Sequence, residues 1–127
     1  MSYKKFILTI LPFLAGGVFL LASTVFADVV EQELGRMPAT VRESAREMIQ
    51  KGVSGDETIQ FIKAMHTNRF DEEQILKALN IVLEAQSRGL PVKPVISKAL
   101  EGMAKKVTHE RTLQAMEAVS SRYAFAF

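Results

Sequence analysis

The chain has 127 residues and no cysteine, with 16 Lys and Arg against 14 Asp and Glu. Without a thiol, disulfides, thiolate catalysis and thiolate metal sites are excluded, so packing alone must stabilise the fold. Two of the basic residues, Lys4 and Lys5, lie at the N-terminus, and the chain after residue 27 carries 14 basic and 14 acidic residues. This neutral balance argues against long-range attraction of nucleic acid, and we expect no nucleic-acid partner.

The first 27 residues have the organisation of an export signal. The two lysines precede an apolar run from Phe6 to Ala22, and small side chains follow up to Ala27. A basic start, an apolar helix and small residues at the exit suit the translocon and signal peptidase. We therefore predict a hydrophobic signal helix over residues 1–27 that is cleaved after Ala27.

The alternative is a membrane anchor that is retained. The apolar stretch from Phe6 to Ala27 has 22 residues, which is long enough to span a bilayer. Either outcome exports residues 28–127, to the periplasm or the medium if cleaved and to the outer side of the inner membrane if anchored. The membrane would be contacted only through the N-terminal segment.

Residues 28–127 are predicted to form a single all-α domain of five to six short amphipathic helices in a compact helical array. A first helix over residues 29–36 ends before Pro38, because the residue before a proline avoids the helical region. Each later helix begins at a capping or proline signal and carries apolar residues on one face. The longest helix is expected to begin at Asp71, and the last to run to Arg122. The expected starts are Thr40, Ser54, Asp71, Pro91 to Pro94 and Thr108.

An apolar residue stands immediately before each of the last four helix starts, and the spacing of these residues suggests an internal repeat. The steps are 17, 20 and 17 residues, so residues 53–89 align with residues 90–126 at an offset of 37. Two-helix solenoid repeats have about this size, since stacking buries a face that one unit cannot bury alone. Two tandem 37-residue helix pairs are one interpretation, and a chance match of amphipathic helix pairs is the other. The four apolar residues are Val53, Phe70, Leu90 and Val107.

The chain contains no recognisable catalytic, cofactor-binding or metal-binding motif. His66 and His109 are its two histidines, and they lack the short helical spacing of metal ligands. The acidic run from Asp71 to Glu73 is explained by helix capping. Neither a glycine-rich phosphate loop nor a Gly-x-Ser-x-Gly segment is present. We expect no enzymatic activity, no cofactor and no metal, with a metal-responsive protein that uses a histidine as a further alternative.

Apolar side chains are the best candidates for a binding surface. The methionines fall mostly on apolar stripes, where filling of the core is the first interpretation and an adaptable surface for varied apolar partners is the alternative. The chain ends in the aromatic segment Tyr-Ala-Phe-Ala-Phe. We expect this tail to pack on the open end of the array, while capture by a PDZ-type groove is an alternative, and the ending also resembles the terminal signal of outer-membrane barrel proteins. A protein or peptide partner is expected, and a homodimer is compatible with the sequence. The candidate protein-binding residues are Met65, Phe70, Met103, Met116, Tyr123, Phe125 and Phe127.

Two helix starts resemble a motif of small periplasmic helical chaperones. Residues 70–74 (Phe-Asp-Glu-Glu-Gln) and residues 107–111 (Val-Thr-His-Glu-Arg) each half-match the Leu-Thr-x-x-Gln box that occurs twice in chaperones of the Spy and CpxP type. Phe-Asp replaces Leu-Thr in the first copy, and Arg replaces Gln in the second. The resemblance implies an ATP-independent envelope chaperone or stress protein, usually dimeric, whose concave apolar surface holds unfolded proteins. Residues 89–127 also look like parts of uncharacterised exported bacterial helical proteins.

The leading hypothesis is an exported, non-enzymatic helical domain that binds another protein or peptide through an apolar, methionine-containing face. An envelope chaperone is its most concrete form. The alternative is a structural or adaptor subunit with one partner in the cell envelope.

Overall fold

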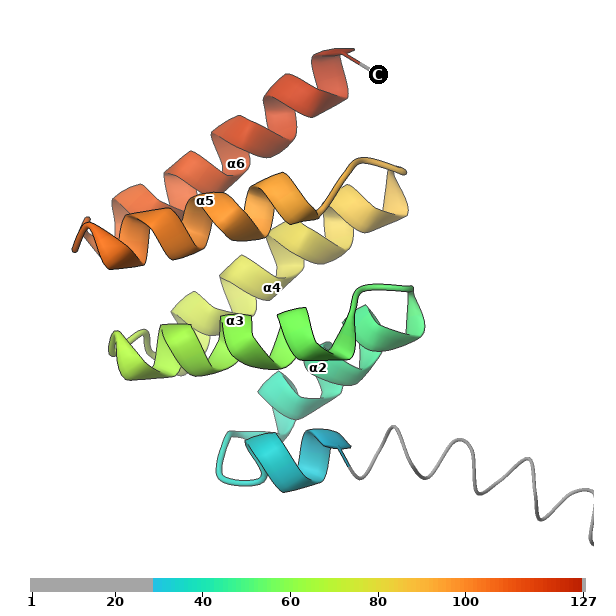
Figure 1. The fold of residues 1–127 in the computed structure, drawn as a ribbon, viewed down its shortest axis with the longest axis vertical. Helices are drawn as coiled ribbons and strands as arrows, with labels where there is room; N and C mark the ends of the chain where they lie inside the picture. Colours follow the sequence, from blue (N-terminus) through green and yellow to red (C-terminus); the bar gives the residue numbers. More distant parts are fainter. Residues whose placement is uncertain (1–28, 127) are drawn as a thin grey trace, which may run out of the picture.

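The computed structural model describes residues 29–126, and this part of the chain is all-helical with no strand (Figure 1). The predicted all-α class is therefore confirmed. The segment predicted as a signal helix or anchor, residues 1–27, and the tail residue Phe127 lie outside the described residues. The helices are the N-terminal helical turn (residues 29–34), α2 (Ala39–Gln50), α3 (Gly55–Thr67), α4 (Glu72–Ser87), α5 (Lys93–Ala104) and α6 (His109–Ala126).

The helices form two layers. Helices α2, α4 and α6 lie side by side in one layer, and α3 and α5 lie side by side in the other (Figure 1). Successive helices alternate between the layers because each connection is a short turn. Neighbouring helices of one layer pack together, and so do α2 with α3, α3 with α4 and α5 with α6 across the layers, whereas α4 and α5 have little contact. The result is a regular stacked array.

The regular stacking depends on four identical turns. Helices α2, α3, α4 and α5 each end in a Schellman motif. In the turn after α3, the Phe70 amide donates to the Met65 carbonyl and the Arg69 amide to the His66 carbonyl, both at 3.0 Å. One residue of each turn has a left-handed backbone, and an apolar residue follows it. The left-handed residues are Gly52, Arg69, Gly89 and Lys106, and the apolar ones are Val53, Phe70, Leu90 and Val107.

The helix starts differ in how they are capped. The sequence signal at Asp71 forms a full capping box, in which its carboxylate accepts from the Gln74 amide and the Gln74 side chain accepts from the Asp71 amide. The expected cap at Thr40 is wrong, because α2 begins one residue earlier, directly after Pro38. The Thr40 hydroxyl instead donates to Glu72 Oε1 at 2.6 Å, which joins α2 to α4.

The expected lengths of two helices also need correction. Helix α6 has 18 residues and α4 has 16, so α6 rather than α4 is the longest in the described range. Helix α6 passes the expected end at Arg122 and continues to Ala126. The last turn of α6 contains neither glycine nor proline, so no local signal ends the helix at Arg122.

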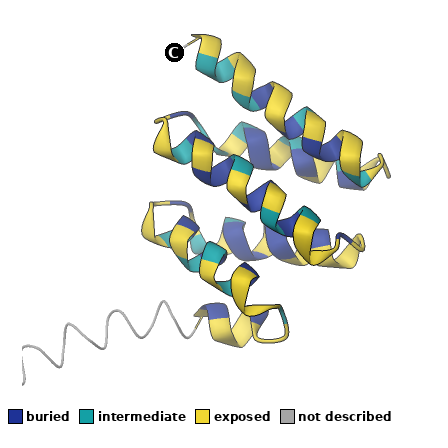
Figure 2. Cartoon of the chain, turned by 180° about the vertical axis from the view of Figure 1, so that it is seen from behind, coloured by how far each residue is buried: buried dark blue, intermediate teal, exposed yellow. Residues whose placement is uncertain are grey.

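The core runs continuously between the layers, where the buried faces of the helices meet (Figure 2). Its largest fully buried side chain is Phe61 on α3. Two buried threonines satisfy their hydroxyls locally, because Thr58 donates to the Ser54 carbonyl at 2.9 Å and Thr112 donates to the Thr108 carbonyl at 3.0 Å. Helices α5 and α6 approach closely where Gly102 faces Thr112, and a Cβ atom on Gly102 would lie 2.8 Å from Thr112 Oγ1. The two helices can pack at this distance only because residue 102 has no side chain.

Candidate functional site

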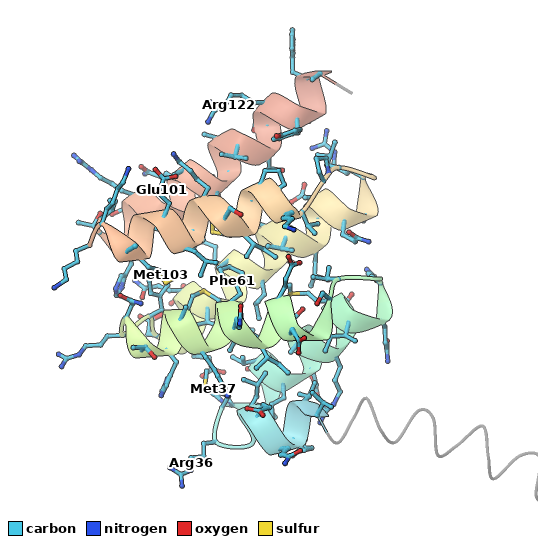
Figure 3. All side chains as sticks on the ribbon, in the orientation of Figure 1. Arg36, Met37, Phe61, Glu101, Met103 and Arg122 are labelled. Carbon is cyan, nitrogen blue, oxygen red and sulfur yellow. The ribbon has the colours of Figure 1, made fainter. Side chains whose placement is uncertain are left out.

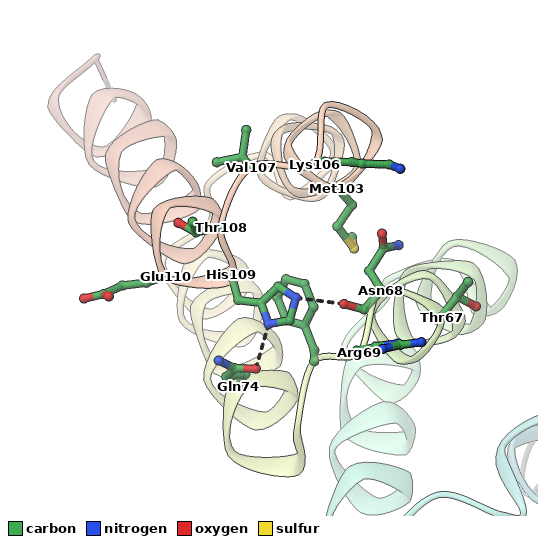
Figure 4. A pocket seen from close by; sticks show the side chains of 11 residues that line it. Thr67, Asn68, Arg69, Gln74, Met103, Lys106, Val107, Thr108, His109 and Glu110 are labelled. Carbon is green, nitrogen blue, oxygen red and sulfur yellow. Dashed lines mark hydrogen bonds between the residues drawn. The ribbon is translucent and has the colours of Figure 1, made fainter.

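The structure has a cavity of about 700 Å³ at one edge of the array, which we call the interloop pocket (Figure 4). It lies between the turn that joins α3 to α4 and the turn that joins α5 to α6. Asn68, Arg69 and Phe70 line it from the first turn, and Lys106 and His109 line it from the second turn and the start of α6. The same type of turn thus supplies both walls.

His109 is the central residue of the interloop pocket. Its Nε2 lies 2.7 Å from the carbonyl oxygen of Asn68, and its Nδ1 lies 3.1 Å from Oε1 of Gln74 (Figure 4). The ring also stacks on Phe70, with 4.0 Å between the ring centroids and 29° between the planes. The side chain of His109, the first residue of α6, therefore contacts both the end of α3 and the start of α4.

A similar bond connects the turns at the opposite edge of the array. There the side-chain amide of Gln86 donates to the carbonyl of Lys51, the residue that caps the end of α2. Asn68 caps the end of α3 in the same way. The last carbonyls of a helix have no partner within the helix, so in both places a later helix supplies the missing contact. Gln86 and His109 therefore have equivalent structural roles: each contacts the carbonyl at the end of an earlier helix, one at each edge of the array.

A second hollow, which we call the C-terminal groove, lies between the start of α5 and the end of α6. It has a volume of about 460 Å³ and is lined by apolar side chains together with the cation of Arg122. Tyr123 is partly buried and packs against the core, whereas Phe125 on the same last turn of α6 is 97 % exposed. Figure 3 shows Arg122 extending from α6 at this end of the molecule. The residues that line the groove are Pro94, Val119, Arg122, Tyr123 and Ala126.

The structure does not bring the seven predicted binding residues together on one surface. Met65 and Met116 are fully buried, and Phe70 and Met103 are nearly so, which places these four side chains in the core. They offer no surface to a partner in this arrangement, because the helical stripes that carry them face inward. The tail is divided, since Tyr123 packs as expected and Phe125 does not. Phe127 lies outside the described residues.

The outer side of α5 carries a group of three charged side chains. Lys105 donates to Glu101 Oε1 at 2.8 Å, and Lys98 lies 3.4 Å from the other oxygen of the same carboxylate. The contact with Lys105, and then the charge of Lys98, lower the pKa of Glu101, while the same contact with Glu101 raises the pKa of Lys105. All three side chains are solvent-exposed to a large extent, so these pairs add solubility more than stability.

The histidines do not form a shared site. His66 is exposed on α3 beside Lys63, in a hollow other than the interloop pocket. Among residues 29–126, no three His, Asp or Glu side chains are grouped so that they could hold a metal ion. In the same part of the chain, no helix combines the length and the apolar character needed to cross a membrane.

Comparisons of the chain with known protein families, with curated proteins and with solved structures each found no match.

The contacts of His109 and Gln86 were not predicted from the sequence. Each joins residues that are more than 30 positions apart in the chain, and their meeting is decided by how the helices stack. The offset of 37 between the two box-like segments is the one signal that pointed to this region, because it aligns the starts of α4 and α6.

Proposed function

We propose that this protein is an exported, non-enzymatic interaction domain that docks a partner protein at the C-terminal groove. The observation that carries the proposal is the exposure of Phe125 on the last turn of α6, since Tyr123 and Ala126 of the same turn line the groove. Aromatic side chains next to an apolar pocket are the usual anchors of protein interfaces. The other exposed positions of α6 are mainly polar or small, namely Glu110, Arg111, Gln114, Glu117, Ala118, Ser121, Arg122 and Ala126.

The lining of the groove indicates the chemistry of the partner. Pro94, Val119 and Tyr123 would contact an apolar side chain, and Arg122 at the rim would pair with an acidic residue next to it. A partner segment with an apolar anchor flanked by Asp or Glu fits both features.

The geometry favours an adaptor with one partner over a chaperone with many. A chaperone surface for unfolded proteins needs a broad exposed apolar face, and the methionines that would supply it are in the core. The alternative function is that of a chaperone, which the resemblance to the Spy and CpxP type implies.

We further propose that the array is built from two tandem 37-residue helix pairs, α3 with α4 and α5 with α6. Support comes from the left-handed turn residues, since Gly52 and Gly89 are separated by 37 positions and so are Arg69 and Lys106.

The test is crosslinking in intact cells followed by purification of the attached proteins. Phe125→Ala is expected to abolish capture of the dominant partner and to leave the melting temperature unchanged, because the ring is almost wholly in solvent. Arg122→Glu is expected to weaken capture through charge repulsion. Gln114→Ala, on the exposed face of the same helix, is the matched control and should keep full capture.

Each outcome of this experiment has a distinct meaning. Undiminished capture by Phe125→Ala would rule out the C-terminal groove as the docking site. A broad set of unfolded proteins in place of one partner would support the chaperone alternative.

Export is tested by the mass of the protein recovered from bacterial cells. Cleavage after Ala27 predicts a soluble protein whose intact mass corresponds to residues 28–127. A full-length mass in the membrane fraction would instead show that residues 1–27 are retained as an anchor. A full-length protein in the cytoplasmic fraction would contradict export in either form.

A further inference from the structure

We infer that the outer side of α5 is a barrier to self-association, which keeps a second copy of this chain from stacking on the end of the array. The barrier consists of three charged side chains, Lys98, Glu101 and Lys105, which we call the end cluster. Figure 3 shows Glu101 on the side of α5 that faces away from α3, whereas Met103 lies between the two helices. Both lysines contact the Glu101 carboxylate from three and four positions along the helix, so they lie on the same side. The end cluster therefore occupies the surface that a further helix of this layer would have to cover.

Helices α3 and α5 belong to the same layer and can be compared residue by residue from their ends. The residue that caps the end of α5 lies 37 positions after the one that caps α3, so Phe61 corresponds to Lys98 and Ala64 to Glu101. Phe61 is fully buried between α3 and α5, and Ala64 packs against the same core (Figure 3). The matching side chains on α5 are charged, with 39 % of Lys98 and 44 % of Glu101 exposed. The outer side of α5 thus lacks the apolar face by which α3 receives its neighbour.

Covering the end cluster would remove its charged groups from water. The attraction between Glu101 and the two lysines already exists while the cluster is uncovered, so a stacked helix would add desolvation without a new ion pair. A second copy that approached through the same side would bring an identical cluster, with two cations and one anion. The two net positive faces would repel each other, which disfavours a symmetric contact between copies.

Apolar side chains beside the end cluster would otherwise favour stacking. Leu100 on α5 and Val107 in the turn after it are each 37 % exposed, whereas the apolar residues of the three earlier turns are buried. One of the earlier residues, Phe70, is covered by the ring of His109 from the following turn. The last unit of a stacked array needs a polar outer face, because an uncovered apolar face can associate with another molecule. The end cluster supplies that polar face on α5.

The test gives α5 the residues that α3 carries at the three matching positions. The full chain with Lys98→Phe, Glu101→Ala and Lys105→Asn should keep its fold, since all three side chains are largely in solvent, and circular dichroism checks this. Sedimentation velocity over a range of concentrations should show self-association that is stronger than in the wild type by about tenfold or more. Lys77→Phe adds the same ring at an exposed position of α4 and is the matched control, which should behave like the wild type. Association of the triple variant no stronger than that of Lys77→Phe would overturn the proposal.

A second measurement leaves the end cluster unchanged. Because the chain has no cysteine, Leu100→Cys and Gln114→Cys each introduce a single thiol, the first between Lys98 and Glu101 and the second on the exposed face of α6. The rate of disulfide formation between copies is divided by the rate of reaction with a small thiol reagent, which corrects for intrinsic reactivity. This ratio should be no higher at position 100 than at position 114. A ratio several times higher at position 100 would show that copies meet through the outer side of α5, which contradicts a barrier there.

Discussion

Replacing Phe61 with alanine is expected to lower the free energy of unfolding by about 3–5 kcal/mol. Phe61 is the largest fully buried side chain of the described residues, and it lies on the inward face of α3 (Figure 3). Its removal takes away apolar contacts and leaves a cavity that the packed helices can fill only in part. Denaturation in urea, followed by far-ultraviolet circular dichroism, measures the loss.

Phe125→Ala is the matched control for this experiment, because it makes the same chemical change on a side chain that is 97 % exposed. Its free energy of unfolding should stay within about 0.5 kcal/mol of the wild type. A domain of this size has only about 5–15 kcal/mol of stability in total, so the difference between the two variants is easily measured. Equal losses in both would show that α3 does not pack as described.

Gly102→Ala is the second substitution with a large expected effect, and its direction is opposite to the one that helix propensity suggests. Alanine in a helix interior is favoured over glycine by about 1 kcal/mol. At this position, however, the new Cβ would lie 2.8 Å from Oγ1 and 3.2 Å from Cγ2 of Thr112 on α6. We expect a net loss of about 1–3 kcal/mol, because α5 and α6 must move apart to relieve the overlap. The loss would appear as a lower urea midpoint.

A double-mutant cycle tests the stated cause. Thr112→Ala removes both close atoms and should be mildly destabilising by itself, since its hydroxyl donates to the Thr108 carbonyl. In the Thr112→Ala background, Gly102→Ala should cost much less than in the wild type. Gly55→Ala is the control, because its Cβ would meet Ile49 at an ordinary 3.9 Å. Strictly additive effects at positions 102 and 112 would contradict a clash between the helices.

Local signals in the sequence predicted the helices well. Asp71 forms its capping box within four residues of chain, and proline at position 94 stands at the start of α5, where it is tolerated. Thr40 was misassigned because its hydroxyl has a partner on α4, which no local pattern contains. Interactions that form inside one turn can be predicted from the order of the residues, and interactions between helices cannot.

The candidate binding residues show a different limit of sequence analysis. An apolar stripe at helical spacing is equally consistent with a core and with a docking face, and the layers of the array decide which one it becomes. Met65 and Met116 fit both interpretations on this pattern, and the structure places both in the core. Phe125 was assigned to the same class and is exposed, because α6 extends to Ala126 and carries it into solvent. The length of α6 was the missing information.

The contacts of Gln86 with Lys51 and of His109 with Asn68 have a consequence for how the chain folds. A side chain of α4 contacts the carbonyl at the end of α2, and a side chain of α6 contacts the carbonyl at the end of α3. A single pair cut from the array would lose both this partner and the apolar face against which it stacks. The array should therefore fold and unfold as one cooperative unit. Removal of α6 would then weaken the turn after α3, and further shortening through α4 would weaken the turn after α2.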